Sequence, residues 1–194
     1  MALKAFLDES SGLRHTAQQV YLIGAALAPA EATDAIRKEL LTLKLPGQTK
    51  VHWSDESESR KKKIVDVMSN IDQMSIIVSH LDVRSRKTER YRRKCLETLY
   101  YQFAEMHVWS VTLEGRTSKQ DEGDKAHIVA LQSQGLSRSI RIEHARGGDE
   151  PMLWIPDVFL GAVNAAHHGD SRYLEKLEGR ILMELRTPAS HGEF

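Results

Sequence analysis

Residues 6–12, FLDESSG, place two carboxylates side by side after a short apolar run that begins at Leu3. The apolar run predicts a strand over 3–8, with Asp8 as its last residue. Charged side chains at such a position are either solvated at the end of the strand or hold something positive there. Glu9 follows Asp8 directly, and successive residues of a strand point to opposite faces. We therefore expect the two acids to have different surroundings.

The rest of the chain alternates strand and helix patterns. The run QVYLIGAAL (19–27) predicts a buried strand, and residues 9–17 predict a hairpin connection with Gly12 as its flexible point. Apolar spacing then predicts, in chain order, helices over 29–44 and from Ser54 or Ser57 to 71, a strand over 74–83, a helix over 87–106, a strand over 108–114, a helix over 119–134, a strand over 139–144, and helices over 153–168 and 171–185. This order predicts an α/β fold with a mixed five-stranded sheet flanked by helices.

Length and composition favour one globular domain. The chain has 194 residues, of which 41% are hydrophobic and 28% charged, values that suit a core of ordinary size. We expect the domain to cover residues 1–187, followed by a flexible tail over 188–194. The single cysteine, Cys95, excludes an intramolecular disulfide and lies in a helical pattern that predicts a core position. With no signal peptide and no apolar stretch of membrane length, the sequence predicts a cytoplasmic protein.

The charges balance overall but are clustered along the chain. Lys and Arg total 27, as do Asp and Glu, so net charge indicates no partner. A basic run opens the long helix predicted over 87–106. Such a run is either a solvated helix face or a contact for nucleic-acid phosphates. The candidate nucleic-acid-binding residues in it are Arg84, Arg86, Lys87, Arg90, Arg93 and Lys94.

Three acids are predicted to converge. Asp8 ends the first strand and Glu114 ends the fourth, so both carboxylates emerge at one edge if these strands are neighbours. Asp157 lies near the start of an apolar helix, where an unpaired acid is costly, although the helix dipole also favours an acid there. Converging carboxylates repel one another unless they share a divalent cation, and hard oxygen ligands suit Mg²⁺ or Mn²⁺. Two such ions can activate water and stabilise the leaving oxygen in phosphodiester hydrolysis.

Three segments resemble the domain-of-unknown-function 3800 family of bacterial and phage proteins. They are FLDESSG at 6–12, KVHWSDES at 50–57 and EPMLWIPDVFLGAV at 150–163, and the resemblance spans essentially the whole chain. It implies a ribonuclease H-like fold and a metal-dependent nuclease-type site. The family's first landmark matches Asp8 and Glu9, its second matches His52 and its third matches Asp157.

The resemblance has departures and gaps. Ser11 is inserted before Gly12, and Trp154-Ile155-Pro156 stands where the family has glutamine-x-alanine. Glu114 stands where ribonuclease H-like folds carry an acid at the end of strand 4, usually an aspartate. Such enzymes also use an acid on a helix, for which Glu89 and Glu97 are equal candidates.

The leading hypothesis is a single ribonuclease H-like domain that uses Mg²⁺ or Mn²⁺ to hydrolyse phosphodiester bonds in DNA or RNA. Asp8, Glu114 and Asp157 would hold the metal, while Glu9 and His52 would orient water or substrate. His52 could act as a proton shuttle or a phosphate contact, or simply pack. Family association adds a partner protein and a role in phage defence or mobile-element biology. Neither the oligomeric state nor the choice between DNA and RNA follows from the sequence.

Two other functions fit the same residues. A catalytically silent scaffold could bind nucleic acid or a partner protein through exposed aromatic segments around Trp53 and Trp154. Carboxylates that lie far apart, or a site occupied by an Arg or Lys side chain, would favour this scaffold. A metal-dependent phosphatase acting on small nucleotides is the third function, and a closed pocket without a basic groove would favour it.

Overall fold

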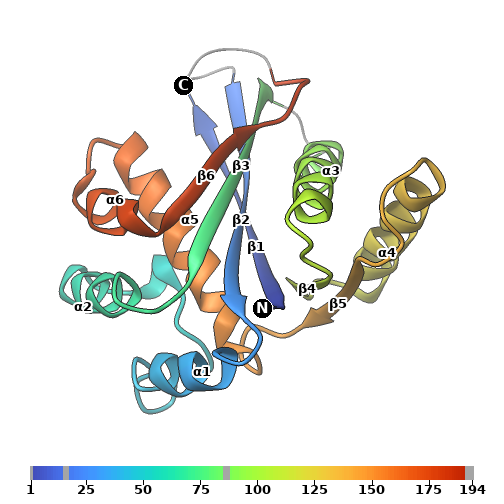
Figure 1. The fold of residues 1–194 in the computed structure, drawn as a ribbon. Helices are drawn as coiled ribbons and strands as arrows, with labels where there is room; N and C mark the ends of the chain where they lie inside the picture. The colour runs from blue at the N-terminus through green and yellow to red at the C-terminus, as the bar shows by residue number, and fades with distance from the viewer. Residues whose placement is uncertain (1, 15–17, 85–87, 191–194) are drawn as a thin grey trace.

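A six-stranded sheet forms the centre of the computed structural model, which describes residues 2–14, 18–84 and 88–190 (Figure 1). Its strands are β1 (Leu3–Arg14), β2 (Gln18–Pro29), β3 (Met74–Val83), β4 (Ser110–Glu114), β5 (Arg141–Ala145) and β6 (Ile181–Arg186), in the order β5-β4-β1-β2-β3-β6. β2 is antiparallel to both β1 and β3, whereas β1–β4, β4–β5 and β3–β6 are parallel pairs. The predicted mixed α/β fold is confirmed, but the sheet has one strand more than predicted.

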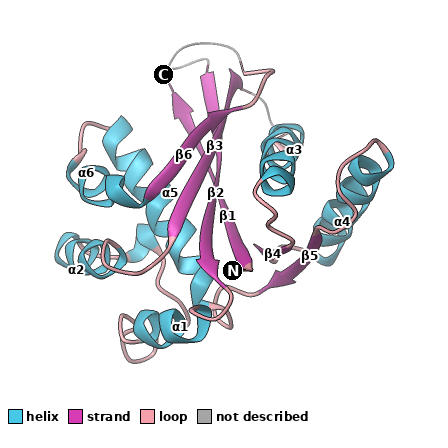
Figure 2. Cartoon of the chain, in the orientation of Figure 1, coloured by secondary structure: helices cyan, strands magenta, loops and turns pink. Residues whose placement is uncertain are grey.

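Helices cover both faces of the sheet (Figure 2). The α-helices are α1 (Thr33–Leu41), α2 (Glu58–Met68), α3 (Glu89–Glu105), α4 (Ser118–Ser133), α5 (Trp154–His167) and α6 (Arg172–Leu177), and the short 3-10 turns are η1 (Trp53–Asp55), η2 (Pro151–Leu153) and η3 (Glu178–Arg180). In Figure 1, α1, α2, α5 and α6 lie on one side of the sheet, and α3 and α4 lie on the other. No helix in the described ranges is long and apolar enough to cross a bilayer.

The alternation of side chains along β1 divides the core in two. Ala5 and Leu7 belong to the core under α3 and α4, which also buries Cys95, as predicted. Phe6 belongs to the core under α1, α2 and α5. Because side chains alternate along a strand, Asp8 continues the Phe6 side and Glu9 continues the Leu7 side. The expectation that the two acids have different surroundings is confirmed.

The predicted end of the first strand is wrong. β1 continues to Arg14, and Gly12 pairs with Val20 of β2 instead of forming the flexible point of a connection. Asp8 therefore lies inside β1, opposite Gly24. β4 pairs with β1 only as far as Leu7 opposite Leu113, so Asp8 is the first residue of β1 beyond the paired segment of β4. Asp8 therefore lies beside the end of β4, although it does not lie at the end of its own strand.

The predicted last helix is half wrong. α6 ends at Leu177, and the segment that follows forms β6, which pairs with the free edge of β3. Ile181, Met183 and Leu185 are half-buried and alternate with exposed residues, which is the period of a strand and not of a helix. Leu, Met, Glu and Arg are all good helix formers, so local propensity favoured the helix that pairing with β3 overrides.

The chain beyond β6 remains in contact with β3. The Thr187 amide donates to the carbonyl oxygen of Ser79, and the Leu81 amide donates to Ser190 Oγ at 2.9 Å. Residues 191–194 of the predicted tail lie outside the described ranges. The first part of that tail is therefore attached to the domain.

Candidate metal centre at the end of β4

Asp8 lies near two other acids, Glu114 and Asp157, which come from two other elements. Asp8 lies on β1, Glu114 is the last residue of β4, and Asp157 lies in the first turn of α5. Asp8 shares a hydrogen bond with Glu114 and is close enough to Asp157 to feel its charge. Burial, followed by the charges of Glu114 and Asp157, raises the pKa of Asp8 from 3.8 to about 8. The amide of Glu9 partly offsets this by donating to Asp8 Oδ1 at 2.7 Å.

Asp157 also orients His52 and the backbone that follows it. Asp157 Oδ1 lies 2.9 Å from His52 Nδ1, and Asp157 Oδ2 accepts a hydrogen bond of 2.7 Å from the amide of Trp53. The contact with Asp157 raises the pKa of His52 above its usual value. Because Asp157 contacts Nδ1, the Nε2 atom of His52 is left to exchange a proton with water or substrate. The ring is 40% exposed, so solvent reaches it.

The close approach of η1 to α5 depends on Gly161. A Cβ atom at this position would lie 2.2 Å from Trp53 Cγ, so only glycine allows the indole to pack here. Trp53 also meets Tyr173 in an edge-to-face contact with ring centroids 5.0 Å apart. Trp53 is thus packed between helices, and Trp154 is only 1% exposed. The prediction of an exposed aromatic segment around Trp154 is wrong.

Lys50 belongs to the same group, and sequence reasoning missed it. Its Nζ donates to Glu114 Oε1 at 2.6 Å, and the charges of Asp8 and Asp157 also act on it. Lys50 and His52 are two residues apart, and Val51 between them is fully buried in the core under α5. An extended segment with its central residue buried turns both neighbours to the same side. The alternation of side-chain directions in KVHW (50–53) could have predicted that Lys50 lies beside His52.

Glu9 does not join this group. It lies on the α3 side of the sheet and forms an ion pair with Arg92, a residue that is only 2% exposed. Arg92 also pairs with Asp124 of α4, which is 1% exposed. Arg116 adds a second guanidinium, 3.3 Å from Asp124 Oδ1. The structure thus places Glu9 in a buried ion-pair network and away from the position predicted for a residue that orients water.

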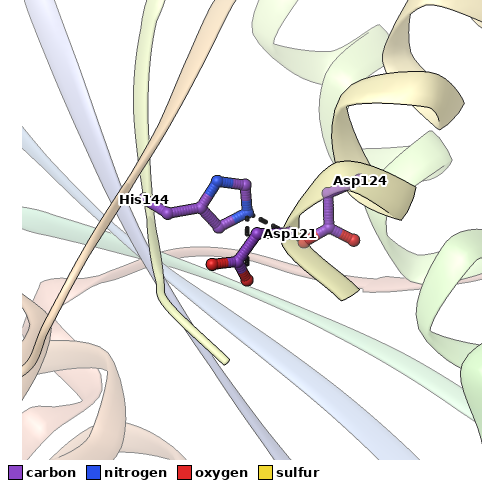
Figure 3. A group of neighbouring side chains, drawn as sticks. All are labelled: Asp121, Asp124 and His144. Carbon is purple, nitrogen blue, oxygen red and sulfur yellow. Dashed lines mark hydrogen bonds and ion pairs between the residues drawn. The ribbon is translucent and has the colours of Figure 1, made fainter. Parts of the chain in front are cut away.

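The same network contains a cluster that resembles a metal site (Figure 3). Asp121, Asp124 and His144 each offer a ligand atom, and these atoms lie within 4.8 Å of one another. His144 Nε2 is 3.0 Å from Asp124 Oδ2. No local spacing in the sequence indicates this cluster, because β5 and α4 bring together residues that are distant along the chain.

The contacts of this cluster fit a metal poorly. Asp124 Oδ1 already accepts from the guanidinium groups of Arg92 and Arg116, and Asp121 Oδ1 accepts from the Arg116 amide at 3.0 Å. Two fixed positive charges next to the acids compete with a cation for the same oxygens. We therefore interpret the cluster as the centre of an ion-pair network that holds α3 and α4 on the sheet.

A small cavity of about 140 Å³ lies between the two groups of charges. Its wall includes Asp8 and Glu114 of the acid group, and Glu9, Arg92 and Arg116 of the ion-pair network. The cavity lies where β4 ends beside β1. Polar groups therefore converge on a space that can admit water and small ions.

The candidate nucleic-acid-binding residues have mixed positions. Arg84, Arg90 and Arg93 are exposed, and Lys94 is partly exposed. Arg86 and Lys87 lie outside the described ranges. Of the two candidate helix acids, Glu89 pairs with Arg116 at 3.0 Å and Glu97 is exposed on α3, a helix that covers the opposite side of the sheet from α5.

The sequence matches no model of a known protein family, and no curated protein shows significant similarity to it. Among solved structures, the chain is similar to a chain of the PCNA:RNase HII complex from Archaeoglobus fulgidus, with a TM-score of 0.45 and 14% identity over 91% of this chain and 77% of that chain. It is also similar to a mutant form of Bst-RNase HIII, with a TM-score of 0.38 and 10% identity over 91% of this chain and 53% of that chain. Similarity at this level carries no argument about function, which must rest on the geometry of the site.

Proposed function

We propose that this protein is a metal-dependent phosphodiesterase of ribonuclease H-like type that cuts a nucleic acid. The observation that supports the proposal is that Asp8 of β1 interacts with both Glu114 of β4 and Asp157 of α5. Burial first, and then the negative charges of Glu114 and Asp157, raise the pKa of Asp8 to about 8, as expected for a buried acid near other acids. A hard divalent cation such as Mg²⁺ or Mn²⁺ would relieve that charge, so the donor set fits the metal.

In this proposal the three carboxylates hold the cation, which when bound polarises the phosphate and lowers the pKa of a water molecule. His52 removes a proton through Nε2, while Asp157 fixes the ring through Nδ1. The hydrogen bond with Asp157 raises the pKa of His52, which makes the ring a stronger base. Asp157 therefore serves both the cation and the base.

The substrate class follows from the position of the basic residues. Glu89 of α3 contacts Arg116, which follows Glu114 by two residues, so the start of α3 lies close to the end of β4. Arg90 and Arg93, near the start of α3, are exposed. Positive side chains at the end of the sheet that carries the acid group, although on its other side, suit a polyanion whose backbone passes the metal and whose flanking phosphates need neutralisation. This arrangement favours a nucleic acid over a small nucleotide as substrate.

The test is cleavage of end-labelled single-stranded DNA, duplex DNA, RNA and an RNA/DNA hybrid, in the presence of Mg²⁺ or Mn²⁺. We expect the wild type to cut at least one substrate, and Glu114→Gln to cut it at least ~100-fold more slowly because a charged ligand is lost. Asp72→Asn, an exposed carboxylate on the turn before β3, is the matched control and should cut at the wild-type rate. No cleavage by the wild type of any substrate with either metal would contradict the proposal.

One observation favours a second function, the catalytically silent scaffold that binds nucleic acid. Lys50 already neutralises part of the acid group by its 2.6 Å contact with Glu114, as a counter-charge would in a site that binds no metal. A scaffold would retain oligonucleotide binding with no cleavage, and its affinity would not change on addition of Mg²⁺. An increase in affinity with Mg²⁺ would exclude this second function.

A further inference from the structure

We infer that the Lys50 ammonium occupies the place of a second cation, so that the acid group binds one divalent ion instead of two. This inference rests on the proposed function, since it concerns the same site. In this inference, Lys50 supplies a positive charge at a fixed place in the acid group. It also changes the expected metal stoichiometry from the two-ion arrangement that the carboxylates alone suggest.

The charge balance of the acid group with Lys50 favours a single divalent cation. Once a bound cation has displaced the proton of Asp8, the carboxylates of Asp8, Glu114 and Asp157 carry three negative charges, and the ammonium of Lys50 neutralises one of them. A single divalent cation balances the two that remain. A second divalent cation would leave the group with excess positive charge, next to an ammonium that it would repel.

The packing around Lys50 restricts where its ammonium can lie. The side chains of Lys50 and Glu114 are only 30% and 22% exposed. Gly147, in the turn after β5, covers the contact so closely that a Cβ atom there would lie 2.4 Å from Glu114 Oε1 and 2.9 Å from Lys50 Cδ. No side chain other than the hydrogen of glycine fits at this position without moving Lys50 or Glu114.

The turn that covers Lys50 is itself anchored. The Trp154 indole, buried at the start of α5, donates from Nε1 to the carbonyl oxygen of Gly147 at 2.6 Å. Glu150, at the end of the turn, accepts from Arg37 Nε and Nη2 in a two-pronged ion pair, with distances of 2.9 and 2.7 Å. The turn that covers Lys50 is therefore held at both Gly147 and Glu150. A surface lysine that paired with Glu114 by chance would have neither anchor.

The experiment is a count of bound Mn²⁺ by electron paramagnetic resonance of the free ion, with calorimetry alongside, on the wild type and Lys50→Met. Methionine keeps most of the length of the side chain and removes its charge. We expect one site in the wild type and a second, weaker site in Lys50→Met. Lys62→Met, an exposed lysine on α2, is the control and should keep one site.

The outcomes separate this inference from the proposed function. Two sites in the wild type, or one unchanged site in Lys50→Met, would overturn the role of Lys50 and leave the metal centre intact. No binding by either protein would overturn the metal centre itself, and the inference with it. The wild-type count still tests the inference if Lys50→Met fails to fold, because a value of two overturns it.

Discussion

Replacing Asp8 with asparagine should change how stability depends on pH. Asparagine has the shape of aspartate but stays neutral, so the repulsion from Glu114 and Asp157 disappears. In the wild type without metal, the pKa of Asp8 is raised to about 8, against 3.8 in the unfolded chain. The folded protein therefore keeps a proton on Asp8 that the unfolded chain releases.

The sign and size of the effect follow from proton linkage. Below pH 4 both states are protonated and Asp8 costs nothing, but stability is lost progressively as the pH rises from about 4 to about 8. Each pH unit in this window contributes at most ~1.4 kcal/mol, which sets an upper limit of ~6 kcal/mol for the whole window. Because solvent reaches part of the Asp8 side chain, we expect about half of that limit, ~3 kcal/mol.

Urea unfolding at pH 5, 7 and 9, in the presence of a chelator, measures the effect. The unfolding free energy of Asp8→Asn minus that of the wild type should increase by at least ~2 kcal/mol from pH 5 to pH 9. Groups distant from Asp8 contribute equally in the two proteins, so the difference reports the titration of Asp8 together with the acids coupled to it. Asp72→Asn is the control and should show no such trend. A difference that stays constant within ~0.5 kcal/mol would refute the reasoning.

Three further predictions concern packing and substrate contacts. Arg92→Met should lower the unfolding free energy by ~3–5 kcal/mol, because the buried carboxylate of Asp124 loses one of its positively charged partners. A loss below ~1 kcal/mol in urea unfolding would count against the ion-pair network. Gly161→Ala should cost ~1–3 kcal/mol by displacing Trp53, whereas Gly123→Ala, whose Cβ would meet nothing within 4 Å, should leave thermal unfolding unchanged or slightly raised. The double variant Arg90→Glu/Arg93→Glu should weaken oligonucleotide binding in fluorescence anisotropy and make the affinity less dependent on salt concentration. The control Lys38→Glu on α1 should change neither, and equal effects of the two variants would show that binding does not involve α3.

The sequence was sufficient for the elements whose pattern agrees with their local propensity. The bounds of β3 match the prediction, and those of α3 and α5 differ from it by one or two residues, because apolar residues repeat there at the period of the element. β6 was missed because its residues favour a helix locally and the strand exists only through the free edge of β3. The extension of β1 past Gly12 was missed for a related reason, since β2 holds it in register.

Part of the site was predictable: the acids from their places beside apolar runs, and His52 from the family resemblance. Asp8, Glu114 and Asp157 were identified in this way, and in the structure Asp8 interacts with each of the other two. Lys50 was not, because its role depends on Gly147 and on the turn after β5, which no local pattern connects to residue 50. The burial of Arg92 was equally hidden, since its neighbours in the basic run are exposed and only the approach of α4 brings Asp124 to it.

The central claim is that the acid group at the end of β4, and not the cluster on α4, holds a divalent cation. Calorimetric titration of Mn²⁺ into the wild type, Asp8→Asn and Asp121→Asn tests it directly. The account predicts that the wild type binds, that Asp8→Asn binds at least ~10-fold more weakly, and that Asp121→Asn binds like the wild type. Binding that survives in Asp8→Asn but is lost in Asp121→Asn would place the metal at the α4 cluster and contradict the account.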